Sequence, residues 1–193
     1  MSPFKALILT ANEFEDMELF FPYFRLLEAG ARVDIAAPQK GVIHGEHGYG
    51  LEITKTIADV NPDDYDLLLI PGGFPDGAPL TVRKVAKAQE IARSFFARNK
   101  PVASICHGPW LLVSAGLVKG RHLTGFWHDG VPEEIKAAGG IYEDREVVVD
   151  GNLVTSRWPM DLPAFTREMI KFVPSQSNGA AQRLAQAPSP LPV

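Results

Sequence analysis

The sequence predicts an α/β domain in which a mostly parallel sheet carries helices on both faces. Three observations predict this fold class. Apolar runs alternate with amphipathic stretches along most of the chain, three of the four main runs are almost continuously hydrophobic, and the composition is ordinary for a globular protein, with 46% hydrophobic and 22% charged residues. A chain of 193 residues is long enough for one such domain with a sizeable core.

The four main apolar runs are the expected strands. They cover residues 4–10 (FKALILT), 31–38 (ARVDIAAP), 65–73 (YDLLLIPGG) and 100–106 (KPVASIC). Strands that helices cover on both sides lose the alternation of polar and apolar residues, so these runs favour a buried parallel sheet.

The segments between and after these runs give the remaining elements. Amphipathic patterns predict helices over residues 15–30, 81–100 and 161–173, the last with Asp161 as its cap. The glycine-rich segment 41–60 interrupts the alternation of strands and helices and predicts a hairpin or a segment that leaves the edge of the sheet. A second hairpin is expected over residues 146–156, where Asp150-Gly151 separates two β-rich runs.

Composition bounds the domain organisation and the partners. Residues 1–173 are expected to form one domain and residues 174–193, rich in Pro, Ser, Ala and Gln, a flexible tail. A net charge of −4 gives no basic patch for nucleic acid or anionic lipid. No apolar run approaches the roughly 18 to 20 residues of a membrane span, and the N-terminus lacks the pattern of a signal peptide, so we expect a cytoplasmic protein.

The chain's single cysteine lies in PVASICHGPWLL, where a buried strand is expected to break and a helix to begin. Gly108 removes a side chain where strand and helix backbones approach, and Pro109 suits the first turn of a helix. This is the pattern of a nucleophile elbow with Cys106 in place of serine. Because a helix N-terminus stabilises a thiolate, we expect the pKa of Cys106 to be depressed.

Two further strand ends offer groups that a thiolate nucleophile needs. The turn at Gly72-Gly73 can aim a backbone N–H at an oxyanion, with the amide of His107 as the second donor. Four acids crowd the end of the first strand and the start of the first helix, and one of them could act as a general acid/base: they are Glu13, Glu15, Asp16 and Glu18. The residues alone leave open which one.

Residue order excludes several other sites. A hydrolase triad in the order nucleophile, acid, histidine is not available, because no Asp or Glu lies between Cys106 and His128, the last histidine. Glutamine amidotransfer needs a His-x-Glu downstream of the cysteine, and none is present. His44 and His47 have a ligand-like spacing but no cysteine partner, so we expect no metal site. Glycine-rich phosphate-binding motifs are absent, and no cofactor is expected.

Taken together, LTANEFEDMEL, PGG, KPVASICHGPWLL, AAGGIYED and VVVDGNLVTSRWPMDL resemble the PfpI intracellular-protease family of the ThiJ/PfpI superfamily, over roughly residues 4–173. The resemblance implies a flavodoxin-like three-layer sandwich related to class I glutamine amidotransferases. It also implies Cys106 as nucleophile with His107 beside it, Glu15 as the carboxylic acid close to the sulfur, and Gly73 and His107 as oxyanion donors. Family members form dimers or hexamers, so a homo-oligomer is expected.

Two loops depart from the family pattern. In peptidase-like members a neighbouring subunit's glutamate, in the loop after Pro-Gly-Gly, completes a Cys-His-Glu triad, and here Asp76 is the only candidate in that loop. The loop after LTGF is longer than is typical, which makes Trp127 and His128 candidate pocket residues, with His128 an additional acid/base or a solvated loop residue.

The function expected from these features is that of a cofactor-independent cysteine enzyme acting on small reactive carbonyls, of glyoxalase III or deglycase type, with a stress-protective role. Two alternatives stay open. One is an intracellular cysteine peptidase of the PfpI type. The other is a redox-sensing or chaperone protein without turnover, in which an exposed low-pKa thiol is oxidised by peroxide.

Overall fold

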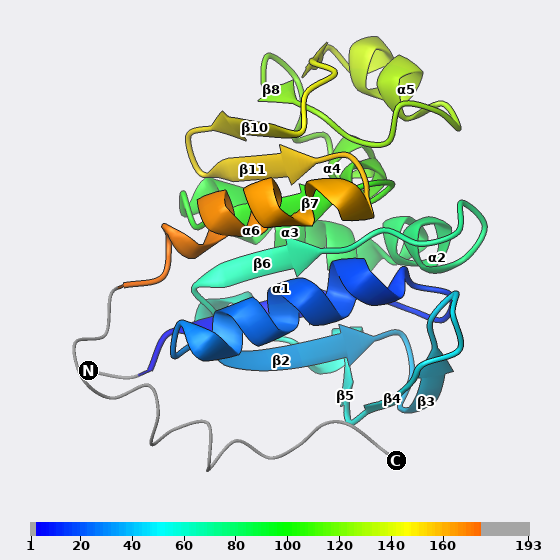
Figure 1. Cartoon of the computed structure of the whole chain (residues 1–193), viewed down its shortest axis with the longest axis vertical. Helices are drawn as coiled ribbons and strands as arrows, with labels where there is room; N and C mark the ends of the chain where they lie inside the picture. The colour runs from blue at the N-terminus through cyan, green and yellow to red at the C-terminus, as the bar shows by residue number, and fades with distance from the viewer. Residues whose placement is uncertain (1–2, 175–193) are drawn as a thin grey trace.

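The computed structural model describes residues 3–174 and is built on a seven-stranded sheet (Figure 1). The strand order is β10-β11-β7-β6-β1-β2-β5, and every neighbouring pair is parallel except β10 and β11. The expected mostly parallel sheet is therefore confirmed. Of the tail expected at residues 174–193, all but Pro174 lies outside the described residues.

The sheet strands and helices have the following bounds. The strands of the main sheet are β1 (Lys5–Leu9), β2 (Arg32–Ala37), β5 (Lys55–Thr56), β6 (Leu67–Ile70), β7 (Val102–Ile105), β10 (Val147–Asp150) and β11 (Leu153–Ser156). Two small sheets pair β3 (Gly41–His44) with β4 (Gly50–Ile53) and β8 (His122–Leu123) with β9 (Ile141–Tyr142). The α-helices are α1 (Asp16–Glu28), α2 (Ala78–Lys84), α3 (Ala86–Ala97), α4 (Pro109–Ser114), α5 (Val131–Ala137) and α6 (Leu162–Ile170).

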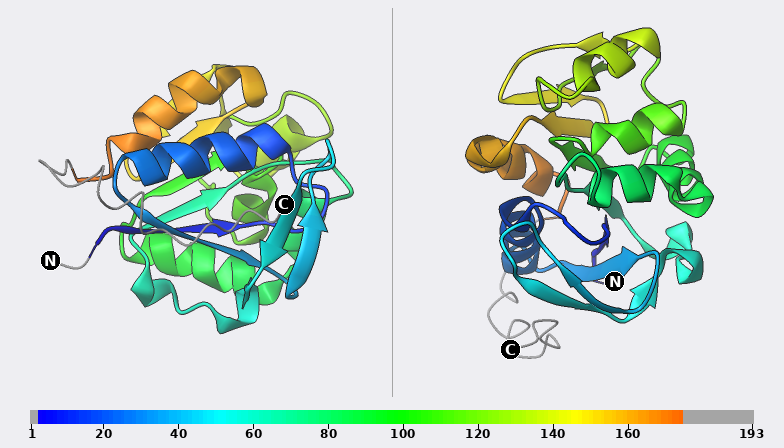
Figure 2. Two further views of the ribbon diagram at one scale, coloured as in Figure 1. Left: turned by 60° about the horizontal axis from the view of Figure 1, so that its bottom comes forward. Right: turned by 90° about the vertical axis from the view of Figure 1, so that its right-hand side faces the viewer.

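Helices cover both faces of the sheet. Helices α1 and α6 lie together on one face, and α3 lies on the opposite one (Figure 2). Both expected hairpins are present as antiparallel pairs, β3 with β4 and β10 with β11. Among residues 3–174, no helix has the length and apolar character needed to cross a bilayer.

The single helix expected over residues 81–100 is instead two helices. Val85 has an extended backbone, with ψ of 109°, and it ends α2 and precedes α3. The hydrophobic pattern runs through this break because Val82 and Ala88, on either side of it, are both buried in the same core. Periodicity reports which residues face the core and is insensitive to a break of one residue.

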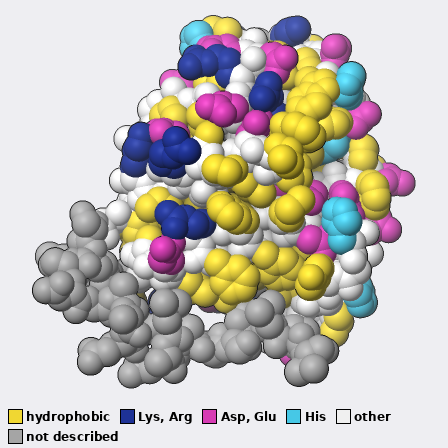
Figure 3. Space-filling view, viewed as in Figure 1, with side chains coloured by type: hydrophobic (Ala, Val, Ile, Leu, Met, Phe, Trp, Pro, Cys, Tyr) yellow, Lys and Arg dark blue, Asp and Glu magenta, His cyan; other side chains and the backbone are white. Residues whose placement is uncertain are grey.

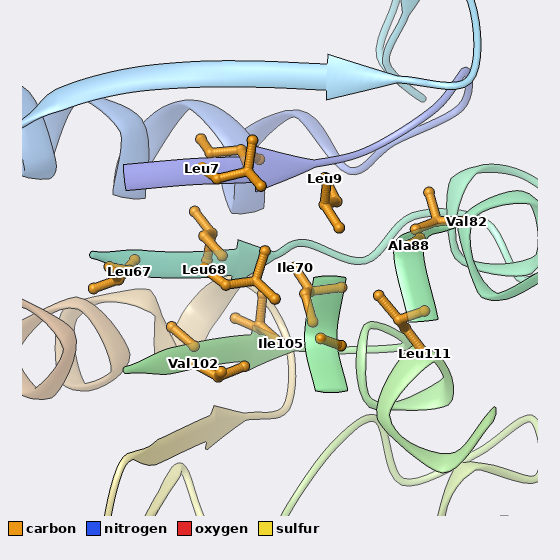
Figure 4. Packing of buried hydrophobic residues seen from close by; sticks show 14 of the residues in the cluster. Leu7, Leu9, Leu67, Leu68, Ile70, Val82, Ala88, Val102, Ile105 and Leu111 are labelled. Atoms are coloured by element: carbon orange, nitrogen blue, oxygen red, sulfur yellow. The ribbon is translucent and has the colours of Figure 1, made fainter. Parts of the chain in front are cut away.

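The core lies between the sheet and its helices. Leu7, Leu68 and Val102 come from adjacent strands, and Leu111 comes from α4 (Figure 4); all four are at most 1% exposed. Full burial of each aliphatic side chain of this size contributes about 1.5–3 kcal/mol. This packing fixes the three central strands relative to one another.

Strands β1, β6 and β7 are neighbours and parallel, so their carboxyl ends open on one edge of the sheet. In open α/β sheets, that edge is where ligand sites form. The loops that leave it here lead from β1 to α1, from β6 to α2 and from β7 to α4. The first two loops also touch each other, through a bridge between Phe14 and Gly73.

Candidate active site

Cys106 occupies a strained turn directly after β7. Its φ of 63° lies in the left-handed region, which a residue with a Cβ adopts at a cost of about 1–3 kcal/mol and mostly at functional sites. A Cβ on Gly108 would lie 2.4 Å from the carbonyl oxygen of Ile70, so only glycine fits where the turn passes β6. Helix α4 begins at the next residue, Pro109. The cysteine therefore lies on a strand–turn–helix elbow.

His107 links the sulfur to a carboxylate. Its Nδ1 lies 3.2 Å from Cys106 Sγ, and its Nε2 lies 3.0 Å from Asp129 Oδ2. Because an ionised carboxylate only accepts hydrogen bonds, Nε2 carries a proton and Nδ1 of the neutral ring is left to accept one from the thiol. The ring lies 4.9 Å, between centroids, from each of Trp110 and Phe126.

Burial and the carboxylate act on His107 in opposite directions. Burial, the larger effect, lowers the pKa of the imidazole, and Asp129 raises it. The net shift is downward, so the ring is neutral at physiological pH and able to accept a proton.

The carboxyl group beside the sulfur belongs to Glu18 rather than to Glu15, which corrects the residue implied by the family resemblance. Glu18 is fully buried in the first part of α1, and its Oε2 accepts a hydrogen bond of 2.8 Å from the amide of Gly72. A Cβ on Gly72 would meet both Glu18 Oε2, at 2.6 Å, and Cys106 Sγ, at 3.0 Å, so these groups face each other across a bare glycine. Glu18 Oε1 has no hydrogen-bond partner within residues 3–174.

Glu15 has a different task. It is the N-cap of α1, and its Oε2 accepts a 2.7 Å hydrogen bond from the amide of Glu18. A cap side chain folds back over its own helix, whereas the residue three positions later is one turn further round. Glu15 therefore holds the start of the helix that presents Glu18 to the sulfur.

Two backbone amides also point to the sulfur. The N–H groups of His107 and Gly73 act on Cys106 as hydrogen-bond donors that lower its pKa. Gly73 has a φ of 150°, and a Cβ there would lie 2.3 Å from the carbonyl oxygen of Glu13. The two amides named as oxyanion donors are thus brought together at Cys106.

The expected depression of the Cys106 pKa is wrong. Burial raises the pKa of the thiol well above its usual value, the charge of Glu18 adds to this, and the two amides oppose it without reversing it. The side chain is only 6% exposed. Helix α4, whose N-terminus was expected to stabilise the thiolate, has only six residues. The redox-sensing alternative rested on an exposed thiol of low pKa, so the structure removes its main support.

Burial and repulsion from Glu15 also raise the pKa of Glu18 well above that of an ordinary carboxyl. Two acids with raised pKa values, Cys106 and Glu18, therefore face each other beside a neutral imidazole. Such a pair retains a proton near neutrality, and the proton is available for transfer.

The acid expected from a neighbouring subunit's loop after Pro-Gly-Gly stays a prediction, since that contact would join two chains. Within one chain Asp76 is exposed, and the acid that pairs with His107 Nε2 is Asp129. Sequence reasoning missed Asp129 because it searched for an acid before a histidine, whereas here the order is cysteine, histidine, acid. The signal that could have indicated Asp129 was the unusual length of the loop Trp127-His128-Asp129-Gly130. Only its aromatic residues, Trp127 and His128, were named as candidates from that length.

Trp127 and His128 lie in an aromatic cluster next to the site. The ring of Trp127 is 4.8 Å from that of Phe126 and 5.2 Å from that of Trp158, and exposed His128 lies 5.8 Å from Phe126. Since Phe126 also contacts His107, these rings form one side of the surroundings of the His107 imidazole.

The remaining candidate, a metal site at the histidines of the 41–60 segment, makes other contacts. His47 Nδ1 is 3.2 Å from Asp16 Oδ2, and no group of three or more potential ligands within residues 3–174 is placed to hold a metal ion. A cavity of about 470 Å³ lies against β10, lined among others by His122 and Glu143, and it includes none of the residues around Cys106.

Comparison with known proteins places this geometry in context. The sequence pattern of the DJ-1/PfpI family matches residues 4–172. The chain is 52% identical over 169 residues to a protein named Deglycase PfpI from Pyrococcus furiosus, covering 88% of this chain and 99% of that one. It is 40% identical over 172 residues to the putative cysteine protease YraA of Bacillus subtilis, covering 88% and 98%.

Solved structures are similar as well. The DJ-1/ThiJ/PfpI-like and ferritin-like two-domain protein of Anabaena variabilis has a TM-score of 0.82 and 31% identity, covering 87% of this chain and 47% of that one. DJ-1beta of Drosophila melanogaster has a TM-score of 0.81 at 24% identity, covering 96% and 97%, which supports the flavodoxin-like fold.

Proposed function

Because the chain belongs to the DJ-1/PfpI family, we propose that it is a cofactor-independent cysteine enzyme acting on reactive carbonyl compounds, of deglycase and glyoxalase III type. The observation that carries this proposal is the placement of His107 between Cys106 and Asp129, with the buried carboxyl of Glu18 also next to Cys106. Relatives named as deglycases at about half identity support the substrate class.

The first step is addition of sulfur to an aldehyde such as that of methylglyoxal. His107 Nδ1, 3.2 Å from Sγ, takes the thiol proton as the S–C bond forms. Asp129 stabilises the imidazolium that results. The aldehyde C=O becomes an oxyanion that the amides of Gly73 and His107 stabilise, and the His107 imidazolium returns its proton to that oxygen, which gives a hemithioacetal.

The second step moves hydrogen between the two substrate carbons. Glu18, as carboxylate, removes the proton from the former aldehyde carbon, and the neighbouring ketone oxygen takes a proton from solvent, which gives an enediol. Glu18 returns its proton to the second carbon while the hydroxyl on the first carbon loses its proton to solvent, which leaves a lactoyl thioester on Cys106. Attack of water breaks the C–S bond, releases lactate and restores the thiol, so methylglyoxal and one water give lactic acid with no external oxidant or reductant.

Deglycation uses the same chemistry on a substrate that already carries the carbonyl compound. An amine or thiol adduct of methylglyoxal transfers its three-carbon unit to Cys106, and the free amine or thiol is the leaving group. A stress-protective role follows from such repair, since these adducts form spontaneously wherever reactive aldehydes accumulate.

The test is lactate formation from methylglyoxal by wild type and by Cys106→Ala, with exposed His122→Ala as a control histidine variant outside the site. Wild type and the His122 variant should give equal rates, and Cys106→Ala should give only the rate of a protein-free blank. Equal lactate yields from wild type and Cys106→Ala would refute the proposal.

A second candidate, cysteine peptidase activity, is favoured by one specific observation. Cys106, His107 and Asp129 have the connectivity of a peptidase triad within one chain, and a relative of 40% identity is named a putative cysteine protease. Fluorogenic peptides separate the two functions. Peptide cleavage that Cys106→Ala abolishes, without lactate production, would replace the lead proposal by this one.

We also propose that the protein is a cytoplasmic homo-oligomer. Hydrophobic side chains gather on the face that α1 and α6 cover (Figure 3), and Met17, Phe21 and Phe24 of α1 are between 42% and 51% exposed. Large apolar residues clustered in this way are typical of protein contact surfaces. Sedimentation velocity of wild type and Phe24→Lys tests this, and a monomeric wild type would contradict it.

A further inference from the structure

We propose that Arg83 is a positioning residue of this active site, because its guanidinium group joins three of the helices that follow site-bearing loops. Helix α2 follows the loop of Gly73, α4 follows the Cys106 elbow, and α5 follows the loop of Asp129. The proposal rests on the proposed function for its kinetic readout only.

All three guanidinium nitrogens of Arg83, on α2, are engaged. Nε donates to Ser114 Oγ at the end of α4 over 2.9 Å, and the two terminal nitrogens donate to the two oxygens of Glu134 on α5, over 3.1 and 2.6 Å. The Arg83 side chain is 17% exposed. A bidentate, half-buried arginine–carboxylate pair has one geometry, so it fixes orientation as well as distance.

One further residue on each side connects these contacts to the pair of His107 and Asp129. Arg83 lies 5.1 Å from the ring of Trp110, and the same ring lies 4.9 Å from the His107 imidazole. On the other side, Glu134 is in the first turn of α5, and its amide donates to the carbonyl of Gly130, the residue after Asp129. The guanidinium therefore acts on both partners of the bond between His107 and Asp129.

That bond needs outside support. Asp129 is 44% exposed and has a φ of 58°, in the left-handed region that a residue with a Cβ disfavours. A short loop in such a conformation holds its carboxylate at 3.0 Å from His107 only while the helix after it stays in place. Anchoring of α5 by Arg83 supplies that constraint.

The decisive variant is Arg83→Lys, because it keeps the charge and most of the side-chain length but cannot form the fork. Arg121→Lys is the matched control. Arg121 also donates two hydrogen bonds from one nitrogen, to Asp150 and Asn152, pairs with the Asp150 carboxylate and lies over an aromatic ring, at 5.3 Å from that of Phe96. It makes none of these contacts with the residues around Cys106.

We expect both variants to lose a similar amount of thermal stability and only Arg83→Lys to lose function. Its kcat should fall by about tenfold or more with little change in KM, because small displacements of catalytic groups cost rate rather than binding. The pH profile should also move. The ionisable groups facing the His107 ring are Cys106 at Nδ1 and Asp129 at Nε2, with Glu18 beyond the sulfur and Arg83 beyond Trp110.

Since Asp129 raises the pKa of His107, a loosened pair should shift the low-pH limb of kcat/KM to lower pH in Arg83→Lys and leave it unchanged in Arg121→Lys. NMR titration of the His107 ring gives the same readout without any substrate, so a failure of the carbonyl-enzyme proposal does not hide the result. Glu134→Gln, which keeps shape and removes the charge, provides a second variant if Arg83→Lys does not fold, and it should shift the His107 titration in the same direction. Kinetics and His107 titration in either Arg83→Lys or Glu134→Gln that match Arg121→Lys would overturn the proposal.

Discussion

The bare backbone at Gly72 is what allows Cys106 and Glu18 to face each other, and replacing it by alanine tests this directly. A Cβ at Gly72 would lie 2.6 Å from both Cys106 Cβ and Glu18 Oε2, where ordinary contact begins at 3.4 Å. Each of the two groups must therefore move about 0.8 Å away from the new Cβ. We expect Gly72→Ala to lose about 1–3 kcal/mol of unfolding free energy, the usual range for overpacking.

Catalysis should suffer as well, because a displacement near 1 Å can cost about a hundredfold in rate. The assays are urea unfolding and lactate formation from methylglyoxal. Gly50→Ala is the control, since its new Cβ would lie 3.6 Å from the nearest atom, in ordinary contact. If Gly72→Ala equals both wild type and Gly50→Ala in kcat and in unfolding free energy, the proposed contact between thiol and carboxyl is wrong.

Three other predictions follow from the ionisable groups. Asp129→Asn should lower kcat by about a hundredfold and shift the low-pH limb of kcat/KM downward, because Asp129 raises the pKa of His107; an unshifted limb would separate Asp129 from the imidazole. Glu18→Gln should lower the pKa of Cys106, whose value the Glu18 charge raises, so iodoacetamide labelling at neutral pH should become faster, and slower labelling would contradict the assignment. Burial, assisted by the charge of Glu15, raises the pKa of Glu46 from 4.5 to about 7. The folded state therefore binds more protons than the unfolded state between these two values, and the free energy of unfolding falls as pH rises from one to the other. This fall should be smaller in Glu46→Gln, as measured by urea unfolding at about pH 5 and pH 8.

Much of the fold could be predicted because its signals are local. Continuous apolar runs predicted four of the five inner strands, and Asp150-Gly151 predicted the hairpin that forms the antiparallel edge. The break at Val85 could not be predicted in this way, since both helices bury the same stripe of residues.

The candidate site also has features that local sequence signals predict and features that they do not. The elbow at Cys106 follows from a strand, a glycine and a proline in immediate succession, and that pattern is readable in the chain. The choice of Glu18 over Glu15 depends on the rotational phase of α1, which the position of its cap sets. The pairing of His107 with Asp129 depends on how α5 packs against the rest of the domain.

The sequence by itself determined that the acids, the glycines and the cysteine each follow a strand of a mostly parallel sheet. Only the tertiary structure decided which acid reaches the sulfur, which carboxylate holds the imidazole, and that the pKa of the thiol is raised rather than depressed. Order along a strand is a local property of the chain, whereas burial and the distance between charges depend on every element packed around the site.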